Sequence, residues 1–208
     1  MISTPGLPRA IAGFEIPQDP ISAATWTWAH RRLPEYLLAH SVRSYLWAAT
    51  LGRDEGLAFE PRILWPASLI HDVGLTRIPR NTRCFEFQGA EVARRFLVGQ
   101  GMSREDAARV GLAIELHMAP SVTRADGVES VLLDRATGID VRGVEIARVA
   151  RVRSAVLGAF PRGAFDARFR NAIQREVETR YGCHSGRLAG RLAGAQHGSP
   201  WDDTGVAT

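Results

Sequence analysis

Apolar residues recur at helical spacing along most of the chain, and this pattern predicts an all-α fold. Segments with apolar positions three and four residues apart alternate with breaks at glycine and proline. We expect helices at about 20–32, 34–51, 61–70, 87–99, 103–117, 128–136, 144–157 and 164–181. No run of residues has the character of a convincing strand. The sequence therefore predicts a compact bundle of about seven or eight helices with no significant sheet.

Capping residues support several of these boundaries. Asp19 precedes Pro20, which gives a favourable N-cap followed by a favourable first helical residue. Ser103 stands three residues before Asp106 at the start of the fifth helix, in the manner of a capping box. The sixth helix is expected to end near Gly138, which would put Asp140 at its end or in the following turn.

The two ends of the chain differ in composition from its centre. Residues 1–15 contain prolines and glycines without periodicity, and the last residues are rich in glycine and other small residues. We therefore expect a flexible N-terminal arm over 1–15, a single domain over 16–184 and a flexible C-terminal tail over 185–208.

Charge and composition exclude some classes of function. The 208 residues carry a formal net charge of +4, and every basic residue is an arginine, spread along the chain among acids. A nucleic-acid-binding face would need these cations clustered, so no nucleic-acid partner is expected. No apolar run approaches the roughly 20 residues that span a bilayer, and no signal peptide is evident. We therefore expect no membrane partner and a cytoplasmic location.

The cysteines and tryptophans carry weaker information. Cys84 and Cys183 lie far apart and form no C-x-x-C pair, which argues against a cysteine zinc site and predicts free thiols. Trp26, Trp28 and Trp47 belong either to the core or to the contact face of a homo-oligomer.

The segment Ser68 to Leu75, which reads S-L-I-H-D-V-G-L, sets a histidine beside an aspartate within an apolar run. Burying an unpaired carboxylate costs several kcal/mol, so His71 and Asp72 need a cation, an arginine or a hydrogen-bonding partner. A bare His-Asp dipeptide is more often a helix cap or a salt bridge than a metal site.

Other predicted helices bring similar donors. His40, His117 and Asp140 each come from a mostly apolar neighbourhood, as the His71–Asp72 pair does. Nitrogen and oxygen donors of this kind suit zinc or iron. A site built from His40, His71, Asp72 and Asp140 would leave room for a water molecule, whose pKa a metal lowers towards about 7.

The order His, His-Asp, Asp resembles that of the HD-domain superfamily of metal-dependent phosphohydrolases, and the surroundings resemble its cyanamide hydratase-like branch. The matching segments are H-S-V-R-S-Y-L-W-A from His40, L-I-H-D-V-G-L from Leu69, R-C-F-E-F-Q-G-A from Arg83, A-I-E-L-H-M-A-P from Ala113, A-T-G-I-D-V-R-G from Ala136 and F-P-R-G-A-F from Phe160. The likeness covers roughly residues 16–180.

The resemblance implies a metal held by His40, His71, Asp72 and Asp140, with zinc as the expected ion and iron or manganese as alternatives. Dinuclear members use two further histidines between the His-Asp pair and the last aspartate. This chain offers only His117 there, so a single metal ion is expected.

The resemblance also implies two catalytic candidates. His117 would lie beside the bound water and the substrate as an acid, a base or an orienting group, although a satisfied core histidine is the alternative. Glu86 would hold a substrate amine or support the site, but it could equally cap the fourth helix or pair with Arg83.

Three functions follow from these observations. The first is hydration of a small nitrile-like substrate, as in the conversion of cyanamide to urea. The second is hydrolysis of a nucleotide or phosphomonoester, with Arg77, Arg80 and Arg83 as phosphate ligands or as ordinary surface residues. The third is a metal-binding regulatory domain without turnover. The first two require a small-molecule substrate.

Overall fold

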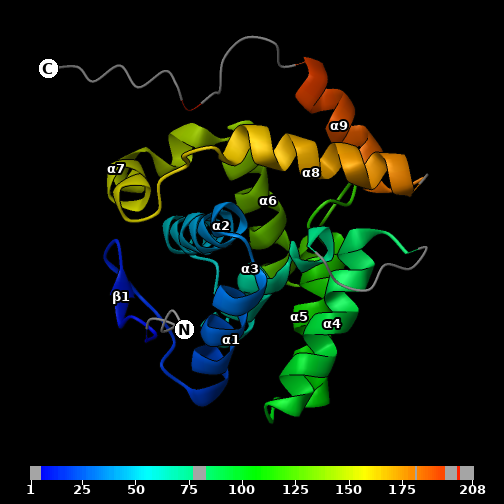
Figure 1. Cartoon of the computed structure of the whole chain (residues 1–208). Helices are drawn as coiled ribbons and strands as arrows, with labels where there is room; N and C mark the ends of the chain where they lie inside the picture. Colours follow the sequence, from blue (N-terminus) through cyan, green and yellow to red (C-terminus); the bar gives the residue numbers. More distant parts are fainter. Residues whose placement is uncertain (1–5, 77–82, 181, 195–200, 202–208) are drawn as a thin grey trace, which may run out of the picture.

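Helices build nearly all of the structure (Figure 1). The computed structural model describes residues 6–76, 83–180, 182–194 and 201. The α-helices within these residues are α1 Pro20–Arg32, α2 Glu35–Asp54, α3 Pro61–Ile70, α4 Phe85–Gly99, α5 Arg104–Leu116, α6 Val128–Arg142, α7 Ala150–Ala159, α8 Phe165–Thr179 and α9 His184–Gly194. Short 3-10 helices occur at Val73–Leu75, Arg124–Asp126 and Ile146–Val149. The predicted all-α helical fold is confirmed.

The expected caps are present where helices begin. The Asp19 carboxylate accepts hydrogen bonds from the backbone N–H groups of Ile21 and Ser22, at 3.1 and 3.2 Å. The Ser103 hydroxyl oxygen accepts one from the N–H of Asp106 at 3.0 Å. Side-chain acceptors therefore satisfy backbone donors that the first turns of α1 and α5 would otherwise leave free.

Both ends of the chain contain more structure than their composition suggested. A hairpin pairs β1 Ala10–Ile11 with β2 Phe14–Glu15 in antiparallel register, and both Ile11 and Phe14 are buried. Helix α9 occupies part of the expected C-terminal tail, and Trp201 is buried against the ring of Trp47. In each case one or two large apolar side chains hold a short polar segment against the core.

Helix α2 passes through the centre of the molecule and contacts both α3 and α8 (Figure 1). Helices α4 and α5 pack side by side as a hairpin, and α6 contacts both α2 and α5. The rings of Trp47 and Trp65 are fully buried, and Trp26 stacks on Trp65 at 6.0 Å between ring centroids. Trp26 and Trp47 thus belong to the core. None of the described helices is both long and apolar enough to cross a membrane.

The expectation of free thiols is wrong. Cys84 and Cys183 form a disulfide across 99 residues, with their Cα atoms 5.6 Å apart. The bond joins the N-cap position of α4 to the residue before α9. Sequence spacing could not reveal it, because the two cysteines meet only after α4 and α8 have packed together.

Glycines let α4 approach the turn that follows α3. A Cβ atom on Gly74 would lie 2.1 Å from the backbone oxygen of Phe85, which is a distance that no side chain tolerates. A Cβ on Gly89 would lie 3.3 Å from the backbone oxygen of His71. Close backbone packing therefore fixes the start of α4 beside the His71–Asp72 turn.

The Gly74→Ala variant tests this packing. Because the new methyl group meets rigid backbone, we expect the free energy of unfolding to fall by about 2–3 kcal/mol. Gly158→Ala in α7 is the matched control, since its Cβ would meet nothing within 4 Å, and it should be neutral or stabilising by about 0.5–1 kcal/mol. Urea denaturation of both variants gives the comparison, and equal stabilities would contradict the proposed contact.

Candidate metal centre

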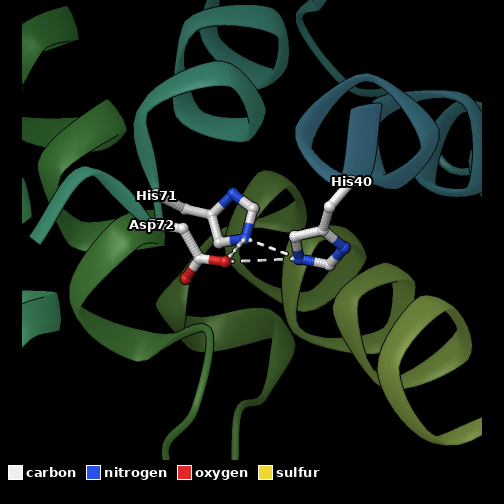
Figure 2. A group of neighbouring side chains, drawn as sticks. All are labelled: His40, His71 and Asp72. Atoms are coloured by element: carbon white, nitrogen blue, oxygen red, sulfur yellow. Dashed lines mark hydrogen bonds and ion pairs between the residues drawn. The ribbon is translucent and has the colours of Figure 1, made fainter. Parts of the chain in front are cut away.

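Three donor atoms converge from α2 and from the turn after α3 (Figure 2). His40 points inward from α2, and His71 and Asp72 follow directly after the last residue of α3. The Nε2 atoms of His40 and His71 are 3.1 Å apart, and they lie 3.4 and 3.3 Å from Asp72 Oδ2. All three side chains are buried, with at most 1% of their surface exposed.

Hydrogen bonds on the far side of each ring settle where the imidazole protons lie. His40 Nδ1 donates to Asp140 Oδ2 at 2.7 Å, and His71 Nδ1 donates to the Ser68 backbone oxygen at 2.8 Å. Both acceptors are oxygens that can only accept, so each ring carries a proton on Nδ1, and each Nε2 offers a lone pair when its ring is neutral. The two Nε2 atoms and the Asp72 carboxylate face one another in a buried space.

This arrangement fits a divalent cation. The described residues offer Asp72 Oδ2 no hydrogen-bond donor, and a buried carboxylate oxygen of this kind needs positive charge beside it. Donors about 2.0–2.1 Å from a tetrahedral ion lie roughly 3.3–3.4 Å apart, close to the observed separations. Buried groups that can hold a metal ion are found together at His40, His71 and Asp72.

Asp140, expected as a fourth ligand, lies behind His40 instead. Its carboxylate accepts hydrogen bonds from Arg43 Nε and Nη2, from Trp47 Nε1 and from His40 Nδ1, all between 2.7 and 2.9 Å. The structure thus brings three of the four expected ligands together. The fourth, Asp140, contacts Nδ1 of His40, on the side of the ring away from His71 and Asp72. To reach a metal, Asp140 would have to give up part of this arrangement.

The position of Asp140 follows from the length of α6. The sequence led us to expect an end near Gly138, but α6 continues to Arg142 and ends at Gly143, whose φ of 66° suits a helix C-terminus. Asp140 therefore lies within the helix and faces α2. Although burial acts in the opposite direction, the guanidinium of Arg43 and the bond from His40 hold the pKa of Asp140 well below its ordinary value.

His117 approaches the other oxygen of Asp72. Its Nδ1 donates to the Ile114 backbone oxygen at 2.6 Å, so its bare Nε2 faces Asp72 Oδ1 at 3.7 Å. Burial, helped by the nearby His71, lowers the pKa of His117 to about 4. His117 is therefore neutral at the edge of the donor cluster, where its Nε2 can accept a hydrogen bond from a bound water or substrate.

Glu86 is near the cluster but separate from it. Its side chain is fully buried, and neither carboxylate oxygen has a hydrogen-bond partner among the described residues. Its Oε1 lies 3.6 Å from Nδ1 of His184 in α9. Burial, with the charge of Glu176 acting in the same direction, raises the pKa of Glu86 to about 7. Since neither oxygen accepts a hydrogen bond from a described residue, Glu86 neither caps α4 nor is hydrogen-bonded to Arg83.

The donor cluster forms the floor of a cavity of about 100 Å³. His117 and the following Met118, Ala119 and Pro120 form one wall, and residues of α6, α8 and α9 form the others. The lining residues outside the cluster and its first wall are Asp134, Thr137, Gly138, Val141, Arg142, Phe169, His184, Arg187, Leu188 and Arg191.

Several residues around the donor cluster and the cavity were missed by sequence reasoning. Arg43 and Trp47 lie three and seven residues after His40, so helical spacing places them on the same face and could have identified them. His184 was assigned no role, and Arg187 and Arg191 lay in a segment taken as tail. Of the three arginines considered as phosphate ligands or ordinary surface residues, Arg83 forms an ion pair with Glu91 and does not line the cavity. Arg77 and Arg80 lie outside the described residues.

Comparison with known proteins agrees with this geometry. The model of the HD domain family matches residues 37–148, which is 112 of the 208 residues and includes all four expected metal ligands and His117. No curated protein matches the chain. The matched region ends before α7, so α8 and α9 lie outside it. The disulfide joins Cys84, inside the matched region, to Cys183, outside it.

The Asp140→Asn variant tests the bond behind His40. Removing the carboxylate charge leaves Arg43 buried without its partner, so the metal-free protein should lose about 3–5 kcal/mol of unfolding free energy. Glu91→Gln, which breaks exposed pairs with Arg83 and Arg95, should cost less than about 0.5 kcal/mol. Denaturant unfolding measures both, and a loss below about 1 kcal/mol for Asp140→Asn would refute the assigned contact.

Glu86→Gln tests the raised pKa of Glu86. Burial in the folded state raises the pKa of Glu86 from 4.5 to about 7, so the folded wild-type protein loses stability as pH rises through that interval and the carboxyl gives up its proton. The difference between the two pKa values corresponds to roughly 3 kcal/mol of unfolding free energy. The stability of the variant relative to wild type should therefore increase by about 2–3 kcal/mol from pH 4 to pH 8.

Unfolding curves at several pH values measure this difference. Glu105→Gln, on the exposed first turn of α5, controls for the loss of a carboxylate. A relative stability of Glu86→Gln that does not change with pH would show that the side chain is not buried in the way described.

Proposed function

Because the chain belongs to the HD domain family, whose members are generally metal-dependent hydrolases, we propose that it is an enzyme that adds water to a small substrate. The observation that carries this proposal is the convergence of the Nε2 atoms of His40 and His71 with an Asp72 carboxylate oxygen that has no hydrogen-bond donor among the described residues, at the floor of a cavity. A divalent ion bound there lowers the pKa of a coordinated water and supplies hydroxide near neutral pH.

The protein residues have separate tasks in this proposal. His40, His71 and Asp72 hold the cation, which we take to be zinc, and a single ion is proposed. Asp140 keeps the proton of His40 on Nδ1 and so keeps Nε2 available. His117, neutral and 3.7 Å from Asp72 Oδ1, can accept a proton from water and return it to the product.

Hydration of a small nitrile-like molecule, of the cyanamide-to-urea type, is the reaction we propose first. The cavity is well below the 300–1,000 Å³ usual for drug-sized ligands, so it suits a substrate of few non-hydrogen atoms. Apolar side chains such as Met118, Val141 and Leu188 line it beside the polar floor. Asp134, whose pKa burial raises to about 6, adds a second group that can exchange protons near neutral pH.

A second candidate, hydrolysis of a phosphomonoester, is favoured by one specific observation. Arg142, Arg187 and Arg191 all line the cavity. Burial and the proximity of Arg191 lower the pKa of Arg142, so two guanidinium groups stand close together in one wall. Such a wall would suit the oxygens of a phosphate group. The volume of about 100 Å³ suits a small phosphomonoester better than a nucleotide.

Metal content and activity together test the proposed function. We expect about one divalent ion per wild-type chain, and none in His71→Ala or Asp72→Ala, because each removes a donor that the others cannot replace. His30→Gln, on α1 and away from the cavity, is the matched control and should keep its metal.

Activity is then measured with cyanamide, other small nitriles and phosphomonoesters. Urea formation in the metal-loaded protein that falls by at least about a thousandfold in both cluster variants would support nitrile hydration. Phosphate release without nitrile turnover would replace the first candidate by the second. A protein that binds the metal but turns over neither class of substrate would favour the metal-binding regulatory domain, and a folded protein that binds no metal would refute all three.

A further inference from the structure

Helix α9 forms one wall of the cavity over the donor cluster. His184, Arg187, Leu188 and Arg191 all line the cavity from this one helix. In Figure 1, α9 lies across the end of α8, outside the bundle formed by α2 to α6. The size of the cavity therefore depends on where α9 sits, even though α9 lies outside the region that matches the HD domain family.

Few noncovalent contacts hold α9 in that place. It packs mainly on α8, and Leu188 and Leu192 are only partly buried against the core. Among the described residues, the side chains of α9 make one polar contact with another element, that of His184 with Glu86. Its length of 3.6 Å is too long for a good hydrogen bond. A helix with so little buried apolar surface opens locally at low free energy.

The disulfide supplies the missing anchor. Cys183 directly precedes α9, and Cys84 is the N-cap residue of α4, whose position is fixed by the close packing at Gly74. The same junction includes the Glu176 carboxylate, which accepts from the Phe85 N–H at 3.2 Å. The first turn of α9 is thus bonded to a rigid part of the molecule. Cys84 is partly exposed, so a reductant can reach the bond.

We propose that α9 is a substrate-selecting wall of the site and that the Cys84–Cys183 disulfide sets its position. With the bond closed, the cavity admits only small substrates. When a dithiol reductant opens the bond, its two thiols become a disulfide while Cys84 and Cys183 each gain one electron and one proton to become thiols. Helix α9 then moves away from the cavity, and larger molecules reach the donor cluster. The selection of substrates rests on the proposed function, whereas the tethering of α9 does not.

Amide hydrogen exchange tests the tethering without any metal. Treating the protein with a trialkylphosphine should speed exchange in α9 by at least about tenfold, because the helix loses its covalent anchor. The phosphine is preferred to a thiol because thiolates bind metals. Exchange in α7, which lies on the opposite side of the molecule from α9 (Figure 1), is the internal control and should not change.

The Cys84→Ser/Cys183→Ser variant should show the fast exchange of α9 without reductant and should not respond to the phosphine. If this variant does not fold, phosphine-treated wild-type protein still provides the comparison. Equal exchange rates of α9 in the oxidised and reduced wild-type protein would overturn the proposal.

Removal of the metal by a bulky chelator tests access to the site. In zinc-loaded protein, ethylenediaminetetraacetate should extract the ion at least about tenfold faster after reduction, since the open wall admits the chelator. Equal extraction rates would overturn the selecting role of α9. Failure to load any zinc would instead refute the proposed function, and the hydrogen-exchange result would still decide whether the disulfide anchors α9.

Discussion

The buried contact between Asp140 and His40 is the interaction on which the site depends. One carboxylate oxygen accepts the Nδ1 proton of His40, while Arg43 and Trp47 occupy the remaining acceptor positions. This fixes the tautomer of His40 and turns its Nε2 lone pair towards His71 and Asp72. Without it, the imidazole could place its proton on Nε2, and the three donors would no longer favour a cation.

The same contact also joins the architecture to the chemistry. Asp140 comes from α6 and His40 and Arg43 from α2, so the pair of helices that builds the core also orients the site. Arg162 extends the link to the start of α8, because its Nη1 donates to the Asp140 backbone oxygen at 2.7 Å. A charge buried this deeply is tolerated only because every acceptor has a donor.

Much of this arrangement could be predicted from sequence because it is encoded locally. Helical periodicity and capping residues such as Asp19 revealed most of the helices. The apolar neighbourhoods of His40, His71 and Asp72 indicated that these side chains would be buried together. Their convergence is the part of the expected site that the structure supports directly.

The remaining features depend on contacts between segments far apart in the sequence. The position of Asp140 could be predicted only by knowing that α6 continues past Gly138. Packing against α2, rather than helix propensity, decides this. The disulfide required knowing that α4 and α8 meet. Helix α9 was overlooked because its glycines and alanines suggested an uncommitted tail, although Leu188 and Leu192 repeat at helical spacing.

The central claim is that His40, His71 and Asp72 together bind one metal ion, and X-ray absorption spectroscopy of zinc-loaded protein tests it most directly. The account predicts a single zinc environment with two imidazole rings and oxygen donors, each at about 2.0–2.1 Å, and no sulfur. The imidazole signal should decrease in His40→Ala. Sulfur ligands, a second metal at about 3.5–4 Å, or a spectrum that His40→Ala leaves unchanged would contradict it.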